Sequence, residues 1–221
     1  ANKNIDLQIE AGTIHGIIGE NGAGKSTLMN ILYGLHRADS GEMLIDGTKA
    51  KIKSSADALS LGIGMVHQHF MLINRFSVLE NVMLGSEGGS LLSSGKIATV
   101  NKLKELGQTF DMEVDPNALV SDLNVGMRQR VEILKALKGG AKILILDEPT
   151  GVLTPQEATQ LFDILDKLRA NGVTVLLITH KLAEIMAITD NVSIMRGGEM
   201  VGHRKTSNTD PQELAELMVG R

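Results

Sequence analysis

Nine consecutive residues near the start of the chain have the spacing of a phosphate-binding loop: Gly19, Glu20, Asn21, Gly22, Ala23, Gly24, Lys25, Ser26 and Thr27. The first eight of them match the pattern G-x-x-x-x-G-K-[ST]. Glycines allow backbone N–H groups to face an anion, because no Cβ atom blocks its approach. A predicted strand, Thr13–Ile18, precedes the nine residues, and a helical pattern with Leu28, Ile31 and Leu32 on one face follows them. The first amides of that helix would face the same anion, so this context predicts a phosphate cradle between a strand and a helix.

The side chains of this loop indicate a nucleotide bound with magnesium. Lys25 supplies a positive charge for the outer phosphates, and Ser26 supplies a hydroxyl for Mg²⁺. A guanine-specific site would need an Asn-Lys-x-Asp motif, and the nearest match, Asn101–Lys104, lacks the aspartate. ATP is therefore the nucleotide that we expect.

A second motif places two acids at the end of a buried strand. The run Ile143–Leu146 is entirely apolar, and Asp147 and Glu148 follow it directly. Ligands bind at the carboxyl ends of the strands in open α/β sheets. We expect Asp147 to hold Mg²⁺, directly or through water, and Glu148 to polarise a water aimed at the γ-phosphate. Seen alone, the pair is also compatible with a solvated acidic loop, but beside residues 19–27 it predicts ATP hydrolysis.

Strand and helix patterns alternate on both sides of a helical stretch. Residues 1–76 and 139–221 alternate, which predicts one ATP-binding core with a mostly parallel sheet covered on both faces. Residues 77–138 are helical and predict an inserted all-helical subdomain. Two N-terminal antiparallel strands, Lys3–Ile9 and Thr13–Ile18, are expected to meet at a tight turn. The predicted fold class is therefore α/β, with a helical insertion.

Local signals mark where several helices begin. Ser77 with Glu80, and Thr154 with Glu157, have the spacing of capping boxes, in which each side chain bonds a free amide at the start of a helix. The segment Gly85–Gly95 is rich in glycine and serine and is expected to form a mobile loop.

Composition excludes several classes of protein. The 221 residues carry a formal net charge of -4 and no cysteine. An acidic average argues against non-specific binding of nucleic acid, and the lack of cysteine removes disulfides and thiolate metal sites. The longest apolar run, Val173–Ile178, is too short to span a bilayer. Any link to a membrane would therefore run through a partner.

Four shorter motifs complete the pattern in a fixed order: Gln68 after an apolar strand, Leu123–Val131 before a helix, Thr150–Pro155 after the two acids, and Thr179 with His180 after Val173–Ile178. In this order, and over essentially its whole length, the chain resembles the ATP-binding domain of ABC transporters, which are P-loop NTPases.

Three segments narrow the resemblance to the ATPase subunits of bacterial sugar and nucleoside importers: Val66–Phe70, Val131–Leu137 and the ending Leu217–Arg221. In that branch two such domains are often fused, and the first ends much as this chain does. The chain also begins with Ala1 rather than methionine. We therefore expect the first half of a tandem subunit, trimmed at its N-terminus.

The resemblance assigns roles to residues of one ATP site. It implies that Gln68 senses the γ-phosphate and shares Mg²⁺ with Ser26 and Asp147. It implies that His180 contacts the γ-phosphate and orients the attacking water together with Glu148. Catalysis is thus expected to rest on Glu148, His180 and Gln68.

The resemblance also implies two partners. A signature loop, made of Asn124, Val125 and Gly126, closes over ATP held by a second ABC ATPase domain, so that two domains enclose two ATP molecules. Closure then drives a transmembrane permease bound near Gln68–Glu80. The chain would accordingly lie at the cytoplasmic face of the inner or plasma membrane, attached through that permease.

Several departures from the family pattern keep other readings open. Asn124 stands where serine is usual, Arg128 where glutamine is usual, and Thr154 where a common aspartate communicates between sites. An aromatic that stacks on adenine would lie upstream of Ala1. One alternative is therefore a regulatory half that binds ATP and hydrolyses it weakly or not at all.

Two further alternatives have less support in the sequence. A soluble, non-transport ABC ATPase acting on ribosomes or DNA would carry coiled-coil insertions or basic linkers, and the chain shows neither. His67 and His69 flank Gln68 and suggest a metal site, but no third ligand accompanies them.

Overall fold

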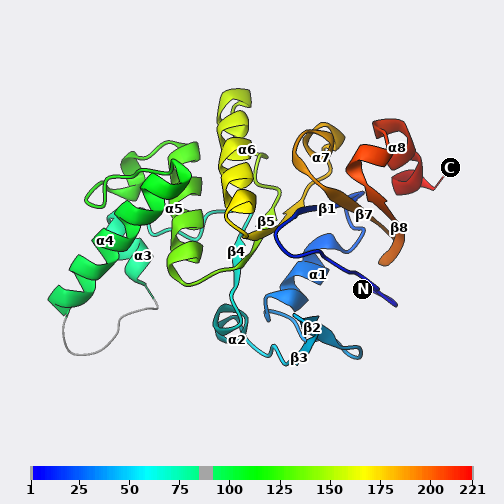
Figure 1. Ribbon diagram of the computed structural model, residues 1–221, viewed down its shortest axis with the longest axis horizontal. Helices are drawn as coiled ribbons and strands as arrows, with labels where there is room; N and C mark the ends of the chain where they lie inside the picture. The colour runs from blue at the N-terminus through cyan, green and yellow to red at the C-terminus, as the bar shows by residue number, and fades with distance from the viewer. Residues whose placement is uncertain (1, 85–91, 221) are drawn as a thin grey trace.

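A computed structural model describes residues 2–84 and 92–220, and its centre is a twisted six-stranded sheet (Figure 1). The strand order is β4-β5-β6-β1-β7-β8. The bounds are β1 Ile14–Gly19, β4 Ile63–Val66, β5 Ile143–Asp147, β6 Thr174–Ile178, β7 Asn191–Arg196 and β8 Glu199–Lys205. Every neighbouring pair is parallel except β7 with β8. The predicted mostly parallel sheet is confirmed.

Helices cover both faces of the sheet. Figure 1 shows α6 (Pro155–Ala170) and α7 (Leu182–Ile188) on one side, and α1 (Lys25–Leu32) and α2 (Ser55–Ser60) on the other, while α8 (Pro211–Val219) packs near β7. Successive side chains of a strand point to opposite faces. Leu144 and Leu146 therefore join one core with α6, whereas Ile145 joins the second core with α1.

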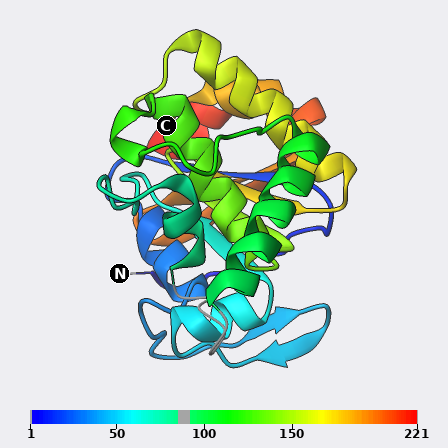
Figure 2. The same cartoon turned by 90° about the vertical axis from the view of Figure 1, so that its left-hand side faces the viewer.

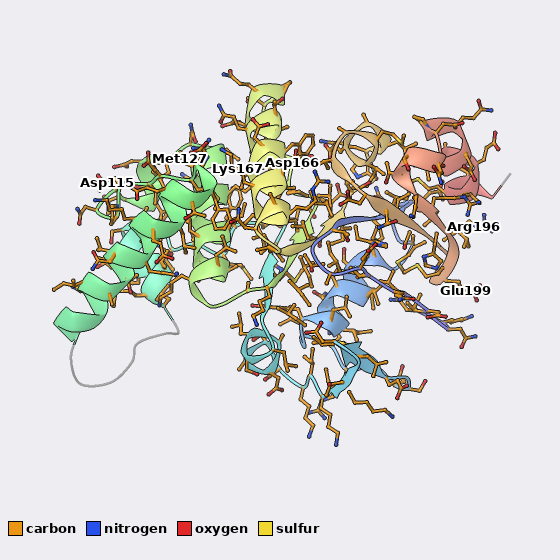
Figure 3. All side chains as sticks on the ribbon, in the orientation of Figure 1. Asp115, Met127, Asp166, Lys167, Arg196 and Glu199 are labelled. Atoms are coloured by element: carbon orange, nitrogen blue, oxygen red, sulfur yellow. The ribbon has the colours of Figure 1, made fainter. Side chains whose placement is uncertain are left out.

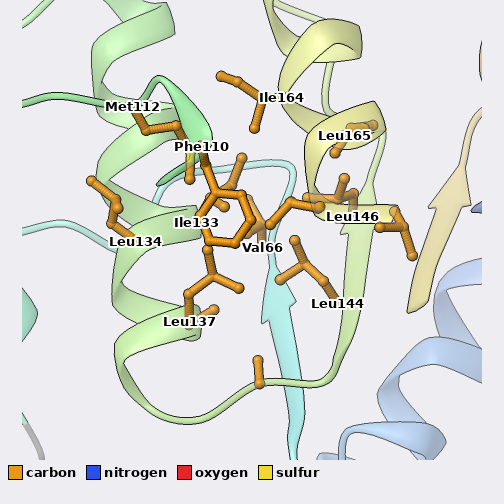
Figure 4. Packing of buried hydrophobic residues seen from close by; sticks show 14 of the residues in the cluster. Val66, Phe110, Met112, Ile133, Leu134, Leu137, Leu144, Leu146, Ile164 and Leu165 are labelled. Atoms are coloured by element: carbon orange, nitrogen blue, oxygen red, sulfur yellow. The ribbon is translucent and has the colours of Figure 1, made fainter. Parts of the chain in front are cut away.

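A helical part lies beyond the β4 edge of the sheet (Figures 1 and 2). It contains α3 (Val78–Met83), α4 (Leu92–Phe110), the short 3₁₀ helix η1 (Val120–Asp122) and α5 (Val125–Lys138). Phe110, Met112 and Leu134 pack with Val66 of β4 and Leu165 of α6 in one continuous core (Figure 4). Because this core crosses the expected boundaries at residues 76 and 138, the division into three segments stays a prediction.

Both predicted capping boxes form. The Ser77 hydroxyl accepts the Glu80 N–H and the Glu80 carboxylate accepts the Ser77 N–H, with the same reciprocal pair between Thr154 and Glu157. The predicted loop Gly85–Gly95 agrees less well. Helix α4 begins at Leu92, so residues 92–95 are helical, and residues 85–91 lie outside the described part of the chain.

The N-terminal segment differs from its predicted form. The second expected strand is β1, but residues 3–9 pair with no strand. Ile5, Leu7 and Ile9 pack against the second core. The alternation of apolar residues therefore reflects burial of one side of an extended segment that forms no hydrogen bonds with a neighbouring strand. The antiparallel pair of the N-terminal part is instead β2 (Met43–Ile45) with β3 (Thr48–Ala50).

Candidate nucleotide-binding site

The phosphate-loop motif forms the turn between β1 and α1. Gly22 and Gly24 have φ angles of 85° and 101°, a left-handed conformation that costs glycine little. A Cβ atom on Gly19 would lie 2.4 Å from the carbonyl oxygen of Met195, so the close passage of this loop beside β7 also requires glycine. The free amides at the start of α1 therefore open onto the carboxyl edge of the sheet, as an anion site requires.

Lys25 is buried at the first position of α1. Its Nζ donates hydrogen bonds to the carbonyl oxygens of Gly19, at 2.7 Å, and Glu20, at 3.1 Å. Burial lowers the pKa of Lys25, and the nearby charges of Glu148 and Asp147 oppose that shift. The lysine and the two acids thus share one electrostatic site.

Asp147 ends β5 beside the start of α1. Burial raises the pKa of Asp147, and the charge of Glu148 raises it further, while a hydrogen bond from Ser26 and the charges of His67 and Lys25 oppose the rise. The Ser26 hydroxyl and the Asp147 carboxylate are hard oxygen donors of the type that Mg²⁺ prefers. Their contact fits a magnesium ion carried with a nucleotide.

Glu148 has an unusual backbone. Its φ angle of 47° is left-handed, a conformation uncommon for residues other than glycine. Its N–H donates to the carbonyl oxygen of Ile178 at 2.9 Å, and its own carbonyl accepts the Gly151 N–H at 3.1 Å. The side chain meets His180, with Nδ1 2.8 Å from Oε1. A carboxylate only accepts, so Nδ1 carries the proton and Nε2 is left free for other partners.

Gln68 lies just past the end of β4 with an exposed side chain. The chain around it is held on both sides. The ring of His67 makes an edge contact with Tyr33, the residue that follows α1, at 6.1 Å between centroids. The Glu132 carboxylate of α5 accepts the Met71 N–H at 2.6 Å. Burial raises the pKa of Glu132.

A surface pocket of about 300 Å³ adjoins this segment, lined by residues that include Gln68, Phe70, Asn74, Val125, Arg128 and Val152. It lies where the helical part meets the loops at the sheet edge.

The alternative of a metal held by His67 and His69 lacks a third ligand. Residues 2–84 and 92–220 contain no group of three His, Cys, Asp or Glu side chains suited to a metal.

The signature residues lie at the start of α5, where Val125 borders the pocket at Gln68. Asn124 caps α5, and its Oδ1 accepts the Met127 N–H at 2.8 Å. Gly126 follows in the first turn and donates its N–H to Glu157 of α6 at 3.3 Å. Figure 3 places Met127 and the β7–β8 turn at Arg196 and Glu199 far apart along the molecule.

That turn marks the position of the phosphate loop, because Gly24 packs near Gly198 within it. The structure thus brings residues 19–27 together with Asp147, Glu148 and His180, and it places Asn124, Val125 and Gly126 away from them.

Two buried polar residues beside the site were not anticipated from the sequence. Gln129 of α5 donates from Nε2 to the carbonyl oxygen of Pro149 at 2.9 Å, and Glu184 of α7 bonds Thr150 and Thr179. Glu184 carries one usable signal in the sequence. It is an acid one residue before the buried Ile185 and one turn before the buried Ile188, where a solvated position would be unusual.

Comparison with protein families gives one match to this arrangement. The family model described as ABC transporter matches residues 2–151. Among curated relatives, the nucleoside import ATP-binding protein NupA of Lactococcus lactis subsp. cremoris is 48% identical over 100% of this chain and 44% of its own length. The glucose import ATP-binding protein TsgD13 of Haloferax volcanii is 47% identical, over 100% of this chain and 45% of its own length. The chain therefore spans less than half of these relatives.

Solved structures of ABC transporter cassettes have the same fold. A nucleotide-free ATP-binding cassette from an ABC transporter superposes with a TM-score of 0.84 at 26% identity, covering 100% of this chain and 93% of that one. A dimeric bacterial ABC transporter cassette gives a TM-score of 0.75 at 29% identity, covering 93% and 90%. Within the described ranges, no helix is both long and apolar enough to cross a membrane.

Proposed function

Because the chain belongs to the ABC transporter family, we propose that it binds ATP with Mg²⁺ and hydrolyses ATP to ADP and phosphate to energise an importer. The contact of 2.8 Å between Glu148 and His180 carries this proposal. It lies at the carboxyl edge of the sheet, where Glu148 also acts electrostatically on Lys25 and Asp147. The site therefore holds both a cradle for phosphates and a candidate base beside it.

Each residue has a role that its chemistry supports. The amides of residues 19–27 and the Lys25 ammonium would hold the outer phosphates, while Ser26 and Asp147 would hold the magnesium, which would supply positive charge to the transferred phosphoryl group. Glu148 accepts a hydrogen bond from the attacking water, and His180 Nε2, an acceptor while Nδ1 carries the proton, accepts a second one from that water beside the γ-phosphate. Gln68 would complete the metal site.

A second ABC ATPase domain is the first proposed partner. The signature residues Asn124, Val125 and Gly126 lie far from the phosphate loop of their own chain, so one chain does not enclose a nucleotide between the two motifs. Two chains, or two fused halves, arranged head to tail would place each signature loop over the other's site. Closure of this pair on ATP is the proposed source of mechanical work.

A permease is the second proposed partner. Met71, Ile73 and Phe76 are exposed apolar side chains within Gln68–Glu80, and the pocket at Gln68 adjoins them. We expect a permease helix to dock there and to hold the chain at the cytoplasmic face of the membrane. The printed names of the relatives favour a sugar or a nucleoside as the transported solute.

The first test measures Mg-ATP hydrolysis against protein concentration. We expect turnover to rise faster than linearly, because two chains form each site. Glu148→Gln removes the proposed base and should lower turnover by about 100-fold or more while ATP still binds. Glu113→Gln, an exposed acid in the helical part, is the matched control and should leave turnover unchanged. Equal turnover by the Glu148→Gln variant would exclude Glu148 as the base.

One observation favours a second candidate, a regulatory half with weak or no hydrolysis. The Oδ1 atom of Asn124, which replaces the usual serine, is engaged with the Met127 N–H of its own helix. If that bond persists in the dimer, the Nδ2 donor of Asn124 approaches the opposite ATP from a different position than a serine hydroxyl would. ATP binding without turnover at every protein concentration, with turnover restored by Asn124→Ser, would support this candidate.

A further inference from the structure

We propose that Glu184 is a positioning residue that sets the contact between Glu148 and His180; this rests on the proposed ATP hydrolysis. Glu184 lies in the first turn of α7 and is 8% exposed. It touches neither of the two catalytic side chains. It bonds instead to the residues beside them, on the two loops that leave β5 and β6.

The carboxylate joins these loops through two buried threonines. The Thr150 hydroxyl donates to Oε1 of Glu184, and the Thr179 hydroxyl donates to Oε2 at 3.1 Å. Thr150 stands two residues after Glu148, and Thr179 directly precedes His180. One side chain therefore fixes the spacing of the loops that carry the base and the histidine.

Lys181 completes the network and fixes the direction of its hydrogen bonds. Its Nζ lies 3.2 Å from Glu184 Oε1 and donates to Thr150 Oγ1 at 3.0 Å, while its backbone N–H donates to Thr179 Oγ1 at 3.1 Å. Each hydroxyl thus accepts from Lys181 and has one proton left, which goes to Glu184. A carboxylate accepts on both of its oxygens, whereas the amide of glutamine accepts on only one, so this arrangement requires glutamate.

The strained backbone of Glu148 explains why the hydrogen bonds of Glu184 to Thr150 and Thr179 are needed. A left-handed residue other than glycine persists only where its surroundings hold it. The carbonyl of Pro149, the next residue, is held by Gln129, and Thr150 is held by Glu184. Without the Glu184 bonds, Glu148 and His180 are free to separate, and displacement of a catalytic group by about 1 Å costs about 100-fold in rate.

The test compares Glu184→Ala and Glu184→Gln in two measurements. The first is the kinetics of Mg-ATP hydrolysis. We expect kcat to fall about 10- to 100-fold in Glu184→Ala, with the KM for ATP within about threefold, because residues 19–27 are untouched. Glutamine keeps one acceptor oxygen, so its kcat should lie between those of the alanine variant and the parent.

The second measurement is independent of turnover. Long-range ¹H–¹⁵N spectra of the His180 ring report which nitrogen carries the proton. The parent should show Nδ1–H, and Glu184→Ala should show a mixture of both forms once the Glu148 contact loosens. If the parent hydrolyses no ATP, this spectrum still decides the proposal for Glu184, while the proposed function fails by itself.

Glu213→Ala is the matched control, since Glu213 likewise accepts from a threonine, Thr209, and pairs with a basic side chain, Arg204. It should leave both kcat and the His180 spectrum unchanged. Unaltered kcat and an unaltered His180 spectrum in the Glu184 variants would overturn the proposal, as would equal effects from Glu213→Ala. If Glu184→Ala does not fold, the isosteric Glu184→Gln decides by the same two measurements.

Discussion

Three polar side chains form a hydrogen-bonded row across β1, β7 and β8. His15 Nε2 lies 2.7 Å from Ser193 Oγ, which lies 2.8 Å from His203 Nδ1. His15 and Ser193 are buried, and Nδ1 of His15 has no hydrogen-bond partner in the described part of the chain. The sequence offered no reason to connect these histidines, because they meet only through the pairing of strands distant along the chain.

This row predicts a loss of stability in mild acid. Burial, and then the charge of His203, lower the pKa of His15 from 6.5 to about 4. The unfolded chain therefore binds a proton first, so the contribution of His15 is complete above pH 6.5 and is lost as the pH falls toward 4. By pH 5 the free energy of unfolding should have dropped by about 2 kcal/mol from this group alone.

Urea unfolding between pH 7.5 and 5 measures that drop. His15→Gln should flatten the dependence of the unfolding free energy on pH, whereas the exposed His36→Gln should retain the parent's slope. An identical slope in the His15 and His36 variants would contradict the assignment.

Among the elements, α6 depends on its first turn. The Thr154 hydroxyl accepts the Glu157 N–H at 3.3 Å, and the Glu157 carboxylate accepts the Thr154 N–H at 2.9 Å. Thr154→Ala should lower the free energy of unfolding by about 1 kcal/mol, because one helical amide loses its acceptor. Thr159→Ala, later in the same helix and exposed, should change it by less than about 0.5 kcal/mol. Thermal unfolding of the pair checks the difference.

Sequence patterns predicted most elements and failed where a pattern has two physical causes. The two capping boxes and the strand expected at Ile143–Leu146 were predicted correctly. The alternation of Ile5, Leu7 and Ile9 requires only that one side be buried, which a strand and an unpaired extended segment satisfy equally. Which of them forms depends on whether a neighbouring strand has free hydrogen-bonding groups there, and that is a property of the whole sheet.

At the scale of the whole molecule, the sheet and the helical part pack closely where β4 meets α5. A Cβ atom on Gly64 of β4 would lie 2.9 Å from the Cβ atoms of both Ala136 and Ala141. Gly64→Ala should therefore push α5 away from the sheet and lower the free energy of unfolding by about 1–3 kcal/mol. Among the described residues, the atom nearest to a Cβ on Gly95 of α4 would be Met83 Cε, at 3.9 Å. Gly95→Ala should be neutral or stabilising by up to about 1 kcal/mol. Chemical denaturation of the two variants measures both changes in the free energy of unfolding. Equal changes would contradict the tight packing at Gly64.

The site was predictable from sequence to the extent that it follows the sheet. Residues 19–27, Asp147 and His180 stand at the carboxyl ends of β1, β5 and β6, and parallel strands bring such ends to one edge. Glu184 was not predictable in this way, because it reaches the edge from a helix through two threonines. The roles of Gln68 and of Asn124, Val125 and Gly126 stay predictions, since each depends on a nucleotide and a second domain.

The left-handed backbone of Glu148 has a consequence for protein engineering. Glycine and asparagine adopt φ near 47° at lower energy than glutamate, so a search that ranks substitutions by melting temperature alone would favour them at this position. Either substitution would also remove the negative charge of Glu148, which relieves its repulsion with Asp147 in the folded state. Selection for thermal robustness and selection for turnover thus act in opposite directions on a single residue, and a thermostabilised version of this chain should be designed with position 148 held constant.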